Sequence, residues 1–105
     1  MKRKVRGKWY DTTKASLLFE YDNGLYPDDF NYVSGDLYIT PEGEYFLDAE
    51  GGAFTRYAVH VGRGWRRGSE KIIPMSKEEA REWASDRFTP EEVNKMFSQP
   101  RSHAL

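Results

Sequence analysis

The stretch Asp36–Asp48, with the sequence DLYITPEGEYFLD, decides the fold of this chain. Pro41-Glu42-Gly43 separates two short runs of apolar and aromatic residues, Leu37-Tyr38-Ile39 and Tyr45-Phe46-Leu47, and residues of these types favour strands. Proline fixes φ and glycine accepts positive φ, so these three residues favour a tight turn. The stretch therefore predicts a β-hairpin with strands at 36–40 and 44–48.

Four further strands are predicted around this hairpin, because β-branched and aromatic residues are enriched there. They span residues 4–10, 15–21, 57–61 and 70–73. Asn23-Gly24 favours a turn, since both residues tolerate positive φ. We expect irregular loops at 25–34 and 62–69 and an interruption of strand structure at Gly51-Gly52. The last strand is expected to end at Pro74.

The remaining residues change to a helical period. Ser76 and Glu79 have the spacing of a capping box, and Thr89-Pro90-Glu91-Glu92 repeats it. Each box precedes an apolar stripe on one helix face. The first stripe is Ala80, Trp83, Ala84 and Phe88, and the second is Val93, Met96 and Phe97.

These patterns predict one α+β domain over residues 1–98 and a flexible C-terminal tail over 99–105. The domain is expected to contain an antiparallel sheet of five or six strands, with two short C-terminal helices packed on one face. We expect Trp83 and Phe88 to be core residues that cover that face.

Composition excludes several protein classes. The 105 residues contain no cysteine, which excludes disulfides and thiolate metal sites. The longest apolar run, Leu17–Phe19, is far below the roughly 20 residues that a membrane span needs. No apolar segment follows the basic residues 1–4, so no signal peptide is expected. The chain is therefore predicted to be cytoplasmic, with no membrane partner, no cofactor and no metal.

Charge is strongly segmented although the net charge is only -1. Residues 1–8 are basic, residues 9–50 carry many acids and a single base, and residues 51–71 are again basic. Opposite charges on adjacent strands would produce this pattern for solubility alone. The alternative is a dipolar surface with one acidic face and one basic face for partners.

No catalytic pattern is present in the sequence. His60 and His103 are the only histidines, and His60 has no partner that the sequence identifies for a nucleophilic triad. The stretch Gly62–Gly68, GRGWRRG, has Arg67 where the third glycine of a dinucleotide-binding loop belongs. We therefore predict a protein that is not an enzyme and has no catalytic residues.

The basic residues are the first candidates for partner binding. An arginine fork clamps phosphate and a tryptophan stacks on a base or a partner side chain. The candidates are Arg63, Trp65, Arg66 and Arg67 in the loop and Lys2, Arg3 and Lys4 at the N-terminus. The alternative is an acidic surface at Asp22, Asp28, Asp29 and Asp36.

Several short strings resemble a group of small uncharacterised proteins from bacteria, phages and other mobile elements. The likeness covers roughly residues 8–88 and contains no catalytic signature, so no functional residue carries over. The strings are Tyr10-Asp11-Thr12 with Ala15, Glu20-Tyr21 with Asn23-Gly24, Leu37-Tyr38 with Thr40, Gly43, Tyr45-Phe46-Leu47, Glu50-Gly51-Gly52, Ile72-Ile73-Pro74, Ser76, Glu79-Ala80 and Glu82-Trp83-Ala84. The resemblance implies a mobile-element context, where short proteins often block host defences by binding, as anti-CRISPR proteins do.

Three functions remain open at this point. The first is an inhibitor that binds a protein complex of a host defence system. It would either imitate nucleic acid with its acidic residues or bind an acidic surface of the complex with its basic loop. The second is an accessory protein that binds nucleic acid through the basic loop, against which the near-neutral net charge argues. The third is a regulatory module with a protein partner. The sequence predicts no oligomeric state.

Overall fold

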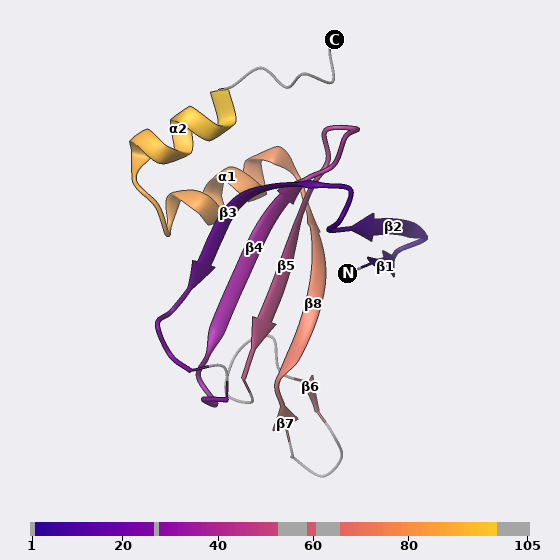
Figure 1. The fold of residues 1–105 in the computed structure, drawn as a ribbon, viewed down its shortest axis with the longest axis vertical. Helices are drawn as coiled ribbons and strands as arrows, with labels where there is room; N and C mark the ends of the chain where they lie inside the picture. Colours follow the sequence, from indigo (N-terminus) through magenta and orange to yellow (C-terminus); the bar gives the residue numbers. More distant parts are fainter. Residues whose placement is uncertain (1, 27, 53–58, 61–65, 99–105) are drawn as a thin grey trace.

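The computed structural model describes residues 2–26, 28–52, 59–60 and 66–98. Four antiparallel strands form a central sheet in the order β3-β4-β5-β8, and two helices pack across one end of it (Figure 1). The strands are β3 (Ser16–Asp22), β4 (Val33–Ile39), β5 (Tyr45–Gly51) and β8 (Ser69–Met75). The helices are α1 (Lys77–Ser85) and α2 (Pro90–Ser98). The predicted α+β class is confirmed.

The hairpin predicted from Asp36–Asp48 is present as β4 and β5, and it is longer than expected. Ile39 pairs with Tyr45 next to the turn, and the pairing continues to Val33 and Gly51. The Thr40 amide donates a hydrogen bond to the Glu44 carbonyl at 2.8 Å. Gly43 has φ +86, which is the conformation that glycine tolerates best.

The predicted single strand at 4–10 is wrong, because the chain turns back on itself there. β1 (Lys2–Val5) and β2 (Lys8–Asp11) form an antiparallel two-stranded sheet of their own. The two turn residues, Arg6 and Gly7, have φ values of +51 and +81. Positive φ at both central residues matches the right-handed twist of a hairpin. Arg6 adopts positive φ at the first of these positions, where asparagine is the usual residue.

The prediction of one sheet with five or six strands is also corrected. The central sheet has four strands, and the other described strands form two separate pairs. The second pair consists of β6 (Val59–His60) and β7 (Arg66–Arg67), so strand structure begins inside the loop predicted at 62–69. Residues 57–58 and 61–65 of the predicted strand and loop lie outside the described residues.

The last strand does not stop at Pro74 as predicted, since β8 continues to Met75 and Pro74 pairs with Phe46. β8 is at the edge of the central sheet, where a missing N–H removes no hydrogen bond to a further strand. The predicted tail at 99–105 lies outside the described residues.

Both predicted capping boxes are confirmed. The Ser76 hydroxyl accepts a hydrogen bond from the Glu79 amide at 3.1 Å, and the Ser76 amide donates to the Glu79 carboxylate at 2.8 Å. Thr89 and Glu92 repeat the exchange at 3.2 and 3.0 Å. These bonds satisfy helix-terminal amides and lower the pKa of both glutamates.

The main core lies between the central sheet and the helices. Trp83 is buried there as predicted, and Phe88 is half-buried against the same cluster, with its ring centroid 4.6 Å from that of Phe19. Leu37 and Leu47 cover the same side of the sheet. Gly35 allows close approach, since a Cβ there would lie 2.9 Å from the Trp83 ring.

A second, smaller core lies on the opposite face of the sheet. Tyr10 of β2 packs on Phe46 and Ile72, so the β1–β2 hairpin covers part of that face. The molecule therefore has helices on one side of the sheet and a hairpin on the other, beside the β8 edge (Figure 1). No helix in the described ranges is long and apolar enough to cross a membrane.

Candidate functional site

The face of the central sheet opposite the helices carries six carboxylates. Successive side chains on a strand point to opposite faces, so the neighbours of the inward-facing Leu37 and Leu47 point away from the helices. The strand register extends this placement to β3 and β8. The resulting acidic face consists of Glu20, Asp22, Asp36, Asp48, Glu50 and Glu70.

Several acids of this face lie directly opposite one another. Asp36 pairs with Glu20 on one side and with Asp48 on the other. Glu50 pairs with Glu70 across β5 and β8. Directly opposed side chains are about 4.5–5.5 Å apart at Cβ, and like charges at that distance destabilise a sheet. The repulsion between these acids therefore opposes folding.

Burial and mutual repulsion shift the protonation of this face. Burial, together with hydrogen bonding to Glu70 and the charges of Glu70 and Asp36, raises the pKa of Asp48 to about 7. Burial and the charges of Glu20 and Glu70 likewise raise the pKa of Asp36. The Oδ1 atom of Asp48 is buried and has no hydrogen-bond partner among the described residues. Asp48 is thus partly protonated near neutral pH.

The raised pKa of Asp48 predicts that the fold loses stability as pH rises from about 4 to 7. Its ordinary value is 3.8, so the folded chain binds more protons than the unfolded chain in this window. Replacing Asp48 with asparagine removes the free-energy cost of ionising this carboxyl group in the folded chain. Because the side chain is only half-buried, solvent screening limits the gain at pH 8 to about 1 kcal/mol. Thermal melts should then show a Tm higher by about 4–8 °C, and no gain at pH 4.

Asp11→Asn is the matched control, since hydrogen bonds from Thr13 lower the pKa of that aspartate. It should gain nothing at pH 8. If Asp48→Asn kept the pH dependence of the parent protein, the carboxyl group of Asp48 would not be the origin of the instability.

A hollow opens at the β3–β4 side of the acidic face. It has a volume of about 410 Å³, and Glu20, Asp22 and Asp36 line it with Tyr21, Tyr32 and Ser34. The lining is largely polar, and the Tyr21 ring is not part of it, because that ring packs on Trp83 and Phe88 on the helix side of the sheet. The three carboxylates of this hollow suit the cationic end of a basic side chain.

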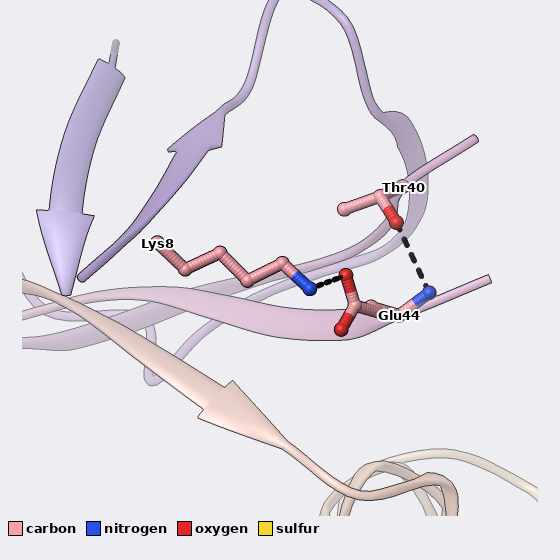
Figure 2. A network of polar contacts seen from close by, with 3 residues as sticks. All are labelled: Lys8, Thr40 and Glu44. Atoms are coloured by element: carbon pink, nitrogen blue, oxygen red, sulfur yellow. Dashed lines mark hydrogen bonds and ion pairs between the residues drawn. The ribbon is translucent and has the colours of Figure 1, made fainter. Parts of the chain in front are cut away.

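Polar contacts fasten the β1–β2 hairpin to the central sheet at two places. The Lys8 ammonium contacts the Glu44 carboxylate, and the Glu44 amide donates to the Thr40 hydroxyl at 3.0 Å (Figure 2). The bond with Glu44 raises the pKa of Lys8. The Arg3 guanidinium donates to the Glu70 carbonyl at 2.9 Å. Arg3 therefore reaches the border of the acidic face.

The predicted basic candidates are dispersed. Lys2 and Lys4 project from the outward face of the β1–β2 hairpin, whereas Arg3 projects from the other side, toward β8. Arg66 and Arg67 form β7, opposite His60 and Val59. Arg63 and Trp65 lie outside the described residues.

The predicted acidic candidates divide into two groups. Asp22 and Asp36 belong to the acidic face and line the same hollow. Asp28 and Asp29 lie exposed in the loop between β3 and β4, where the Asp29 carboxylate accepts a hydrogen bond from the Asn31 amide at 2.8 Å. Asp28 and Asp29 therefore belong to the loop, where Asp29 stabilises a turn.

Sequence reasoning missed four members of the acidic face: Glu20, Asp48, Glu50 and Glu70. The available signal was the period of two, which places Asp48 and Glu50 on the side of their strand that Leu47 and Ala49 do not occupy. No local signal paired Glu70 with Glu50, because that contact depends on how β8 docks beside β5.

No group of three or more histidine and carboxylate side chains among the described residues has an arrangement that could hold a metal ion. Comparisons of the chain with protein-family models, curated proteins and solved structures find no match. The assignment of function therefore rests on the residues themselves.

Proposed function

We propose that this chain is a binding protein without catalytic activity whose acidic face occupies a basic, nucleic-acid-binding surface of a partner protein. In the mobile-element context that the sequence resemblance implies, the partner is a host defence complex of the CRISPR–Cas type. The observation that carries the proposal is the set of six carboxylates on one sheet face, several of them opposed at the distance of direct strand neighbours.

The spacing of these carboxylates supports imitation of a phosphate backbone. Strands lie about 4.8 Å apart, and alternate residues on one strand are about 6.7 Å apart. Duplex DNA presents one negative charge for about every 1.7 Å of its axis, and proteins meet that charge with lysine and arginine. A dense array of carboxylates on one sheet face competes for the same basic side chains. Such complementarity accelerates association and selects partners by charge.

The triple variant Glu20→Gln, Asp22→Asn and Glu50→Gln tests this proposal. All three side chains are exposed, so neutral amides of the same shape relieve repulsion and leave the fold intact. The tagged parent chain is used to capture proteins from a bacterial lysate, with and without added duplex DNA. We expect it to retain nucleic-acid-binding proteins that the DNA displaces, and the triple variant to retain at least tenfold less.

The matched control neutralises three exposed acids on the helices, Glu78→Gln, Glu82→Gln and Glu91→Gln, which changes net charge equally. It should bind like the parent. If both triple variants captured equally less protein than the parent, the loss would follow from net charge alone and would contradict the proposal. Unchanged capture by the acidic-face variant, with loss in a Trp65→Ala, Arg66→Ala, Arg67→Ala variant, would assign binding to the basic loop instead.

A further inference from the structure

The outward face of the β1–β2 hairpin presents a tryptophan with two lysine ammonium groups over its ring. Trp9 is 57% exposed, although tryptophan is among the most strongly buried residue types on average. The Lys2 and Lys4 ammonium groups lie 5.0 and 5.9 Å from the centroid of its ring. Lys4 is the direct cross-strand partner of Trp9. One ring and two cations thus form a continuous surface, here called the Trp9 platform.

The fold holds this platform outward. Tyr10, the chain neighbour of Trp9, is buried against Phe46 and Ile72, so alternation places Trp9 on the opposite side of the hairpin. Asp11 is on the outward side too, as the register partner of Lys2. Its carboxylate accepts hydrogen bonds from the Thr13 amide at 2.9 Å and the Thr13 hydroxyl at 2.6 Å. The carboxylate is therefore directed to the local turn, while the lysine ammonium groups lie over the ring.

We propose that the Trp9 platform binds single-stranded nucleic acid, with one base stacked on the Trp9 ring in place of the ammonium groups of Lys2 and Lys4, which move from the ring to the flanking phosphates. Aromatic rings combined with cations are the usual means of binding single strands without sequence preference. The bases of a duplex are already stacked on one another and cannot lie on the ring, which favours a single strand. An acidic peptide would engage the lysines and leave the ring without a partner.

The Trp9 platform is separate from the acidic face. No residue of the acidic face belongs to the Trp9 platform, and the hairpin residues that touch the sheet are on its inward side. Variants of the platform therefore leave the six carboxylates unchanged. Loss of one binding activity does not alter the other.

Fluorescence anisotropy with a labelled 12-nucleotide single strand of mixed sequence tests the proposal. We expect the parent chain to bind this strand more tightly than a duplex of the same sequence at the same salt concentration. Trp9→Ala should weaken binding about tenfold, within the range that stacking of one base predicts. Trp9→Phe keeps a ring and should restore most of the affinity.

The lysines are tested by the salt dependence of binding. Lys2→Ala with Lys4→Ala should reduce the slope of log affinity against log salt by about 1.4, since each phosphate contact with a single strand contributes about 0.7. The matched control, Lys77→Ala with Lys95→Ala, removes two exposed cations from the helices and should leave the slope unchanged.

Several results would overturn the proposal. These are equal affinity for the single strand and the duplex, unchanged affinity in Trp9→Ala, and equal slopes in the two double-lysine variants. Binding of the parent to anionic phosphatidylglycerol vesicles, lost in Trp9→Ala, with no binding to the oligonucleotide would assign the platform to a lipid surface instead.

Discussion

Replacing Trp83 with alanine is expected to lower the free energy of unfolding by about 3–5 kcal/mol. The indole is 8% exposed and lies in the main core between the sheet and the helices. It contacts Tyr21 edge-on at a centroid distance of 6.4 Å, and the Arg87 guanidinium lies 4.7 Å from its ring centroid. Because Gly35 offers no side chain to fill the space, the cavity cannot close by a small rearrangement.

A loss of this size is a large part of the 5–15 kcal/mol that stabilises a typical domain. Chemical denaturation of the parent and variant measures it directly, and Tm should fall by more than about 12 °C. Trp9→Ala is the matched control, because it makes the same substitution at an exposed ring and should change stability by less than about 0.5 kcal/mol. Similar melting of the parent protein and Trp83→Ala would show that α1 does not cover the sheet through this residue.

Replacing Phe46 with alanine is expected to cost about 3–5 kcal/mol as well, and to loosen the β1–β2 hairpin. Phe46 is fully buried on the sheet face opposite the helices. Its ring lies 5.3 Å from that of Tyr10 and 5.2 Å from that of Tyr38 by centroid distance. Tyr10 is the buried apolar side chain that β2 contributes to the second core. Removal of the Phe46 ring therefore takes away one of the two buried side chains of the sheet on which Tyr10 packs.

Hydrogen exchange distinguishes this effect from general destabilisation. In Phe46→Ala the amides of β1 and β2 should exchange faster relative to those of β4 and β5, because local opening needs less free energy than global unfolding. Phe46→Leu keeps apolar volume and should lose less stability and less hairpin protection. Uniform loss of protection across all strands would mean that the hairpin and the sheet unfold as one unit.

Much of the fold could be predicted because its signals act over a few residues. The turn at Pro41–Gly43 needs only the φ preferences of those residues, and the Ser76 and Thr89 boxes need only a side chain three positions away. The burial of Trp83 follows from the helical period. In each case the residues that interact are near neighbours in the sequence, so no knowledge of the tertiary structure is required.

The candidate site could be predicted only in part. Asp22 and Asp36 are identifiable as acids in the acidic segment, yet their membership of one face with Asp48 and Glu70 depends on strand order and register. Asp28 and Asp29 carry the same charge and lie in the loop that the sequence predicts at 25–34, but the sequence does not show that the acidic face excludes them. The residues of the basic loop at Arg63 and Trp65 lie outside the described residues, so their binding role stays a prediction.

The sequence by itself determined the β4–β5 hairpin, both helices and their caps, because propensity, turn chemistry and capping act within about four residues. Only the tertiary structure decided the rest. The stretch 4–10 reads as one strand, but the chain turns at Arg6-Gly7 and buries Tyr10 on Phe46, which is distant in sequence. β8 likewise runs through Pro74 because it lies at a sheet edge. Contacts between distant segments depend on which surfaces remain to be buried once the local elements have formed, and those contacts place the carboxylates on one face and Trp9 in solvent.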